Sequence, residues 1–483
     1  MEFRMNNKKT LGLGLALVPI TVMLLVLSVG HGIMDLRIEP LLLLCAVVAS
    51  TLARLQGFSW DEILASITDK LAKAMPVILI LVCVGAIIGT WMLSGTIPYM
   101  VYWGLKLISP KYILIAAFFI TSVISVCTGT SWGAAGTVGV ALMGVAAGLD
   151  ISLAATAGAV VSGAYFGDKI SPLSDSTNFA AIVADTNLYD HIRHMMYTTV
   201  PAFVLASIVY LIAGFTGISG GISTPEKVSQ ILNELNNLYN FNILLILPPA
   251  LILWGAITKR PVIPVMLTSC VIAIAIGIIF QGFSLQQGID SFMEGFNLTM
   301  FSAQGQSITG IIADVPRLLN RGGMSSMMGT ILLVFCAFSF AGALTITCAL
   351  TVIINRLLKL IHSAGQLIAA TIVTTVAVTG STCDGKLALL IPAELYKEAY
   401  KRLGLDNKNL SRTIEDAGTV IEPLIPWTAA GIFMASTLGV NTLELLPWAV
   451  QCYAGIIFAL ICAFTGLGIA KNSTPGNLNM SEA

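Results

Sequence analysis

Acidic side chains concentrate where glycine and proline interrupt long apolar stretches of this chain. The six acids are Asp168, Asp175, Asp384, Glu415, Asp416 and Glu422. Carboxylate and hydroxyl oxygens are the ligands that small hard cations prefer. A carboxylate removed from water also binds a proton more readily. The sequence therefore predicts oxygen sites at which a cation and protons compete.

Four short clusters, at 127–133, 167–177, 379–385 and 418–428, supply these oxygens. Glycine and proline interrupt regular helical hydrogen bonding there, so backbone carbonyls and hydroxyl groups become available to a ligand. The predicted ion-binding or substrate-binding residues are Thr128, Thr130, Ser131, Asp168, Ser171, Asp175, Ser176, Thr177, Thr379, Ser381, Thr382, Asp384, Glu422 and Thr428.

Two lysines lie within the same clusters. Lys169 follows Asp168 directly, and Lys386 comes two residues after Asp384. A charge at membrane depth costs at least ~2.5 kcal/mol, so each lysine needs a neutralising partner. An internal acid is the favoured partner, and the carboxylate of an organic substrate is the alternative.

Glu415 is a further candidate for proton coupling or counter-charge. It precedes Glu422 by seven residues, so a regular helix would place both side chains on one face. Asp416 ranks lowest among the acids, because it is expected near the cytoplasmic end of its span.

The elements that must position these clusters are membrane-spanning helices. Hydrophobic residues make up 56% of the 483 positions, charged residues make up only 10%, and the mean hydropathy is +0.88. These values exclude a soluble globular protein and a disordered chain. The balance of 25 Lys and Arg against 25 Asp and Glu excludes the basic surface of a nucleic-acid binder.

A span needs roughly 20 apolar residues. The expected spans are 11–30, 38–55, 75–97, 151–184, 197–218, 241–258, 261–281, 327–354, 411–440 and 445–470. Two further stretches, 111–149 and 363–403, each form either two crossings or one re-entrant hairpin, and the hairpin is favoured. The amphipathic stretch 59–73 is expected to be a separate interfacial helix.

The distribution of basic residues orients the protein. A cytoplasmic N-terminus places 17 of the 25 Lys and Arg inside and 6 outside, with Lys169 and Lys386 at membrane depth. Cytoplasmic loops are enriched in Lys and Arg. Both termini are therefore expected in the cytoplasm.

An internal repeat organises the chain. At an offset of 251 positions Thr128-Gly129 falls on Thr379-Gly380, and Pro172-Leu173 falls on Pro423-Leu424. The segment Gly57-Phe58-Ser59 also resembles Gly282-Phe283-Ser284 at a different offset, which implies an insertion within 295–326. Each half holds five spans plus a hairpin, so the second half starts on the opposite side of the membrane. The repeat is therefore expected to be inverted, which is typical of alternating-access transporters.

Two other kinds of chemistry are disfavoured. Residues 129–133 fit the G-x-S-x-G pattern of serine hydrolases, but they lie between apolar helical segments and not in the strand–turn–helix context that this motif needs. The nine cysteines form no C-x-x-C pair and show no metal-ligand spacing with histidine. No ATP-binding P-loop and no cofactor are expected, so transport would depend on ion gradients.

The chain resembles the NhaC-type Na+/H+ antiporters over roughly residues 10–470. The motifs that carry the resemblance are GTSWG at 129–133, GDKISPLSDST at 167–177 and EDAGTVIEPLIPW at 415–427. The resemblance implies an all-α polytopic protein of the bacterial plasma membrane with two inverted repeats. It also implies a homodimer in which a transport domain moves against a scaffold as an elevator. Because the family includes sodium-lactate/malate-proton antiporters, organic-anion exchange stays open as the alternative to Na+/H+ exchange.

The expected division of the chain follows from the repeat. It comprises a cytoplasmic N-terminus (1–10), a first repeat (11–218), an external linker (219–240), a second repeat (241–470) and a cytoplasmic tail (471–483). The hairpins are 111–149 and 363–403, and the broken helices are 151–184 and 411–440. We expect Na+ at Asp168, Asp175 and Thr130 in the first half, with Asp384 or Glu422 tuning proton coupling in the second.

Overall fold

The described part of the chain is helical. This computed structural model describes residues 12–471 without 32, 35, 217–224, 304, 306, 307, 309, 359 and 360, so the predicted N-terminal segment 1–10 and nearly all of the tail lie outside it. Among the described residues nine helices are long and apolar enough to cross a membrane, or up to twelve if each sharply bent pair counts as one span. The protein is therefore a multi-pass membrane protein, as its composition predicts.

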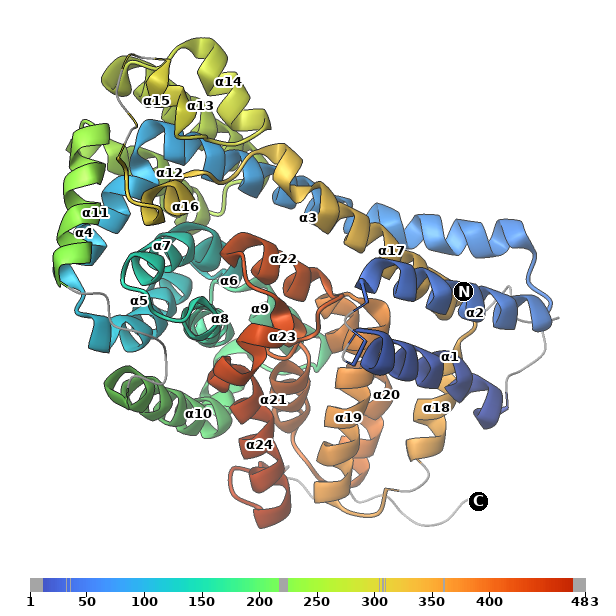
Figure 1. Cartoon of the computed structure of the whole chain (residues 1–483). Helices are drawn as coiled ribbons and strands as arrows, with labels where there is room; N and C mark the ends of the chain where they lie inside the picture. The colour runs from blue at the N-terminus through green and yellow to red at the C-terminus, as the bar shows by residue number, and fades with distance from the viewer. Residues whose placement is uncertain are drawn as a thin grey trace, which may run out of the picture.

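Long helices form one side of the molecule. Figure 1 shows α3 (Trp60–Ser94) crossing it with α17 (Met328–Ile346) alongside, and α2 (Ile38–Leu55) and α1 (Leu13–Val26) next to them. Helices α13 (Val262–Gln281) and α14 (Leu285–Met293) also pack on α3. Their apolar side chains join a core that includes Leu81, Trp91 and Phe340.

The predicted interfacial helix at 59–73 is wrong. These residues are the first half of α3, which continues without a break through the span expected at 75–97. Ser59 begins the helix with a capping box to Glu62. Continuity into the apolar segment overrides the local amphipathic pattern, and one consequence is that Lys70 is only 3% exposed.

The first predicted hairpin and broken helix form a compact group of helices. Its arms are α5 (Ile113–Thr128) and the run α6 (Ser131–Ala134), η4 (Ala135–Gly139) and α7 (Val140–Gly148). The turn between them uses Gly129 at φ 68°, a left-handed conformation that suits glycine. Helix α8 (Leu153–Ile170) packs along α5, ends before Ser171-Pro172-Leu173-Ser174, and is followed by α9 (Asp175–Val183) and α10 (Leu188–Thr216).

The second group repeats this order. Helices α19 (Ala364–Thr382) and α20 (Gly385–Arg402) form the hairpin and turn at Cys383, with φ 57°. The broken helix comprises α21 (Asn407–Ala417), η7 (Glu422–Leu424) and α22 (Ala429–Leu438). It is followed by α23 (Thr442–Leu445), η8 (Leu446–Trp448) and α24 (Val450–Thr465), and α24 packs against α10 of the first group.

The remaining helices connect these groups. They are η2 (Leu27–His31), α4 (Thr96–Leu107), η3 (Pro110–Tyr112), α11 (Pro225–Leu238), η5 (Ile243–Ile246), α12 (Leu247–Ile257), α15 (Thr299–Ser302), α16 (Asp314–Leu319), η6 (Met324–Met327) and α18 (Ala349–Leu358). The expected linker 219–240 is described from residue 225 onward, where it forms α11.

Helix starts correspond between the two halves at an offset of 254 positions. Thr130 caps α6 and Asp384 caps α20, while Ser174 caps α9 and Thr428 caps α22. The ungapped sequence match at 251 is therefore three residues away from the match of the helix starts. Three residues are almost one helical turn. The offset of 254 therefore aligns each acid with a different residue of the other half than the offset of 251 does.

Candidate functional site

A buried ion pair joins the two broken helices. Lys169 on α8 donates to Oδ1 of Asp416 on α21, and Thr198 of α10 donates to the same oxygen at 3.2 Å. Lys169 is 1% exposed and Asp416 is 0% exposed. Asp416 is therefore a buried, paired acid and not an exposed helix-end residue, while its low functional ranking stays a prediction. Lys169 is neutralised by an acid within the chain, as favoured, but this acid is distant in sequence.

Asp168 is held by hydroxyl groups. Ser131, at the start of α6, donates to its Oδ2 at 2.7 Å, and the Ser174 hydroxyl approaches the same carboxylate. Thr177 donates to the backbone carbonyls of Asp168 and Lys169 at 3.2 and 3.0 Å. The hairpin tip and the helix break thus place hydroxyl oxygens around one buried acid, as the sequence predicts.

Glu415 is the least satisfied acid of the site. It is fully buried on α21, and neither of its carboxylate oxygens has a hydrogen-bond partner within the described part of the chain. The Ser176 and Thr419 hydroxyls are its polar neighbours, and it interacts electrostatically with Lys169 and Asp168. Glu415 and Glu422 do not lie on one regular helix, because α21 ends at Ala417 between them.

Glu422 occupies the place in the second half that Asp168 has in the first, since the two are 254 positions apart. It accepts a hydrogen bond from the backbone N–H of Ala430 at 3.4 Å. A side chain at Gly385 would collide with its carboxylate, so glycine permits this close approach. Position 385 corresponds in turn to Ser131. Each acid therefore lies against the first residue of a hairpin arm, but only the first half offers a hydroxyl there.

Asp384 is an N-cap. Its Oδ1 accepts from the backbone N–H groups of Lys386 and Leu387 at 2.8 and 3.2 Å, and the carboxylate interacts electrostatically with Glu422. The Lys386 side chain is exposed and forms no ion pair within the described residues. Among the described residues Lys386 therefore lacks the neutralising partner that is expected for a lysine at membrane depth.

Several predicted hydroxyl ligands are used within their own elements. Thr130 and Thr428 accept from the backbone N–H groups of Gly133 and Gly431, at 3.2 and 3.1 Å. Ser171 donates to the carbonyl of Val126 at 2.7 Å. The others donate to carbonyls one helical turn earlier, and these are Thr128, Thr379, Ser381 and Thr382.

Asp175 does not join Asp168 and Thr130. It is the exposed first residue of α9, whereas Asp168 is buried one helix earlier. Ser176 instead lies beside Ser174, with 3.1 Å between the hydroxyl oxygens. Asp175 acts on the Asp168 carboxylate only electrostatically, and the predicted Na+ set of Asp168, Asp175 and Thr130 stays a prediction.

Tyr165 is a site residue that the sequence does not reveal. It is buried on α8, approaches the Ser131 hydroxyl, and interacts electrostatically with both Asp168 and Glu422. Its spacing of three residues from Asp168 places both on one helix face, but many core tyrosines show that spacing. Thr198 was missed for a similar reason, since it lies in an apolar span without a break.

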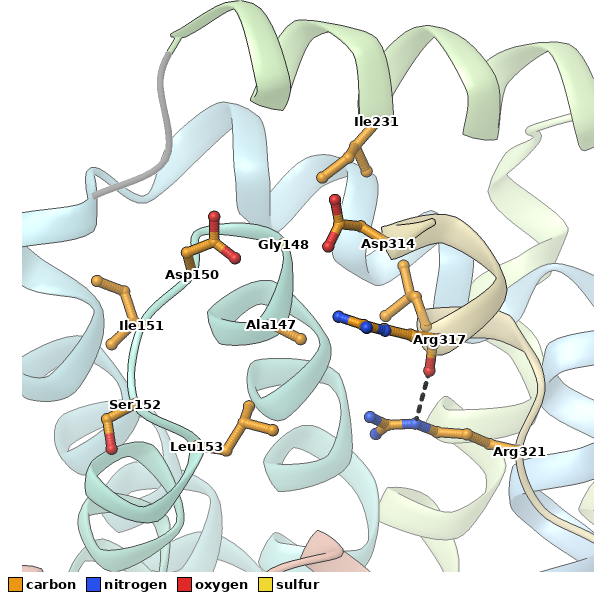
Figure 2. Close-up of a pocket in the computed structure, with 11 residues that line it drawn as sticks. Ala147, Gly148, Asp150, Ile151, Ser152, Leu153, Ile231, Asp314, Arg317 and Arg321 are labelled. Carbon is orange, nitrogen blue, oxygen red and sulfur yellow. Dashed lines mark hydrogen bonds between the residues drawn. The ribbon is translucent and has the colours of Figure 1, made fainter. Parts of the chain in front are cut away.

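A separate cavity of about 370 Å³ lies between the α7–α8 connection and α16. Figure 2 shows the guanidinium groups of Arg317 and Arg321 extending to the same side, with the Asp150 and Asp314 carboxylates above them. Lys227 of α11 bridges these two acids, with N···O distances of 2.7 and 3.1 Å. None of the predicted site residues lines this cavity.

Comparison with known proteins agrees with the resemblance seen in the motifs. Residues 163–467 match the model of the Na+/H+ antiporter family. The chain is 54% identical to an uncharacterized Na(+)/H(+) antiporter of Haemophilus influenzae, over 94% of this chain and 96% of the relative. It is 34% identical to the Na(+)/H(+) antiporter NhaC of Alkalihalophilus pseudofirmus, over 98% and 99% of the two chains.

A third relative differs in the substrates that its name gives. The malate-2H(+)/Na(+)-lactate antiporter of Bacillus subtilis is 34% identical to this chain, over 91% of this chain and 92% of the relative. All three named relatives are antiporters, and two of them align along nearly the whole chain. The chain belongs to the Na+/H+ antiporter family.

Proposed function

We propose that this protein exchanges Na+ for protons by alternating access and binds Na+ between its two broken helices. The observation that carries the proposal is an excess of buried acid. Asp168, Glu415 and Asp416 gather around Lys169, the one lysine of this cluster. Ionised carboxylates are costly to bury without compensation, so the excess acids require a cation or protons.

The oxygen atoms around Asp168 and Glu415 suit Na+ better than a softer metal. The candidate ligands are the Asp168 and Glu415 carboxylates with the hydroxyls of Ser131, Ser176 and Thr419. A proton and a sodium ion compete for the same carboxylates, so loading one releases the other. This competition is the coupling that an antiporter needs.

Glu422 has a different role in this proposal. Its surroundings supply backbone N–H groups and a neighbouring acid, Asp384, and not a ring of hydroxyl oxygens. N–H groups cannot coordinate a cation. We assign proton coupling to Glu422, and Tyr165 links it electrostatically to Asp168.

Inverted repeats and elevator motion belong to the same proposal. The equal offset of four helix starts supports the repeat, as do the capping boxes of Ser59 with Glu62 and Ser284 with Gln287. The hairpins and broken helices would be the moving part, and the layer containing α3 and α17 would be the scaffold. Cytoplasmic termini, a homodimer and re-entrant hairpins complete the proposal, supported by the charge bias and the family resemblance.

Proteoliposomes containing the purified protein and an internal pH dye test this function. An imposed Na+ gradient should drive proton movement in the opposite direction without any organic anion, while a matched choline gradient should not. A Na+ response that requires added lactate or malate would contradict simple Na+/H+ exchange.

Exchange of a small carboxylate is the second candidate, and the cavity with Arg317 and Arg321 favours it. Guanidinium groups bind carboxylates, and neither arginine forms an ion pair in the described part of the chain. Counterflow of labelled lactate or malate tests this candidate. Arg317→Gln should raise the half-saturating anion concentration if the cavity binds the substrate.

A further inference from the structure

A seam of buried hydrogen bonds joins α10 to α21. His191 Nδ1 lies 2.8 Å from the Ser411 hydroxyl oxygen, and His194 Nε2 lies 3.1 Å from Oδ1 of Asn409. Thr198, four residues after His194, makes the third contact, which is its hydrogen bond to the acid of the buried ion pair. The three α10 residues are buried and follow one another at spacings of three and four, so they lie on one face of the helix.

The segment that follows α24 binds the same end of α21. The Asn409 side-chain nitrogen donates to the carbonyl of Ala470 at 2.7 Å, and the Ala470 N–H donates to Asn409 Oδ1 at 3.0 Å. Because a backbone N–H can only donate, these two bonds fix the orientation of the amide, and His194 donates from Nε2 to the same oxygen. Arg412 adds a hydrogen bond to the carbonyl of Gly468 at 2.8 Å. Asn409 thus joins α10, α21 and the C-terminal segment.

The helix held in this way carries the acid of the ion pair. Asp416 lies seven residues after Asn409 on the uninterrupted helix α21, so the two share a face and a displacement at Asn409 reaches Asp416. Lys169 and Asp416 each directly follow a proposed Na+ ligand, Asp168 and Glu415 respectively. A Lys169 ammonium without Asp416 would therefore be an uncompensated cation beside the proposed Na+ ligands, where it would repel Na+.

We propose that His194 and Asn409 are positioning residues, which hold α21 so that Asp416 keeps the charge of Lys169 neutralised beside the Na+ ligands. This inference rests on the proposed Na+/H+ exchange and extends it to side chains that do not contact the ion. The loss of either residue should lower the apparent affinity for Na+ more than the maximal rate of exchange.

His194→Leu tests the proposal in proteoliposomes at one fixed alkaline pH. The variant removes the hydrogen bond to Asn409, so the half-saturating Na+ concentration should rise about threefold to tenfold, the range that one lost hydrogen bond produces. The maximal rate at saturating Na+ should stay close to that of the wild type. His194→Gln should restore the wild-type half-saturating concentration, because the side-chain nitrogen of glutamine can take the place of the Nε2 donor.

Arg193→Leu is the matched control. Arg193 directly precedes His194 on α10 but is exposed, so its loss should leave the half-saturating Na+ concentration unchanged. Ser411→Ala is a smaller change in the same seam, since it removes only the contact with His191, and it should also raise that concentration. Ser411→Ala decides the question if His194→Leu does not fold.

The proposal would be overturned by a folded His194→Leu or Ser411→Ala protein with the half-saturating Na+ concentration of the wild type. A reduced melting temperature and maximal rate without any change in that concentration would make the seam a purely structural contact. Wild-type protein without Na+-driven proton movement would instead contradict the proposed function.

Discussion

The two acids that occupy equivalent places in the two halves have different neighbours. Asp168 accepts from the Ser131 hydroxyl and lies beside Glu415 and the Lys169–Asp416 pair. Glu422 accepts from a backbone N–H and lies beside Gly385 and the capping Asp384. In the proposed function, a similar order of helices supplies cation ligands around Asp168 and proton-site surroundings around Glu422. A similar order of helices does not require a similar function.

The largest effect is expected at Asp168. Asp168→Asn removes one of the two excess carboxylates at the proposed Na+ site, and Na+-driven proton movement should fall at least ~100-fold, as expected when a charged ligand that pairs with a buried cation is lost. The measurement is dye-reported exchange in proteoliposomes at equal protein content. Asp175→Asn is the matched control, because Asp175 is exposed at the start of α9. Equal losses of Na+-driven proton movement in Asp168→Asn and Asp175→Asn would contradict the assignment of the Na+ site to Asp168.

The next effect concerns stability. Asp416→Asn leaves Lys169 buried without its acid and should destabilise the protein by about 3–5 kcal/mol, the range for breaking a buried pair. Thermal unfolding of the purified protein in detergent checks this expectation. Lys397→Met breaks a pair with the exposed Asp185 at 3.2 Å, near the protein surface, and should change the melting temperature little. Equal melting temperatures for Asp416→Asn and wild type would show that the pair is not structural.

Glu422→Gln should separate Na+ binding from proton coupling. The variant removes the proposed proton carrier, so Na+ binding should persist while the pH dependence of exchange flattens. Exchange rates measured from acidic to alkaline pH at saturating Na+ provide the test. An unchanged profile would make Glu422 a packing residue.

The smallest effect is expected outside the buried site, at Lys227. Hydrogen bonding to Asp150 raises the pKa of the Lys227 ammonium. Its contribution to stability is therefore complete below the unfolded-state value of about 10.4 and is lost as pH rises through the higher folded-state value. Lys227→Met should lower the melting temperature slightly at pH 8, and the difference from wild type should shrink at strongly alkaline pH. A difference that grows with pH would contradict this sign.

The sequence predicted an all-helical multi-pass protein because apolar length is a local signal, and the described helices confirm this. The division into repeats with re-entrant hairpins stays a prediction. The sequence also predicted that Asp168 is a buried acid surrounded by hydroxyls. It did not identify Asp416 as the partner of Lys169, since 247 positions separate them and only the folded chain brings them together. The pairing of Asp168 with Glu422 was missed for another reason. Matches of common residues favoured an offset of 251, whereas the helix caps correspond at 254.

The burial of Lys70 also could not be predicted from the local sequence pattern. The segment around Lys70 has the alternation of an interfacial helix, and its neighbours Asp69 and Lys73 are indeed exposed. Only the continuation of α3 into the helices packed around it buries Lys70. A local pattern cannot report which turn of a long helix enters the protein interior.

Direct Na+ binding tests the central claim, that the first-half acids hold the cation. Equilibrium binding of radioactive Na+ to purified protein at alkaline pH should be retained in Glu422→Gln and lost in Asp168→Asn, with both variants folded as judged by their elution volume and melting curve. Retained Na+ binding in Asp168→Asn together with its loss in Glu422→Gln would contradict the account and assign the cation to the second half.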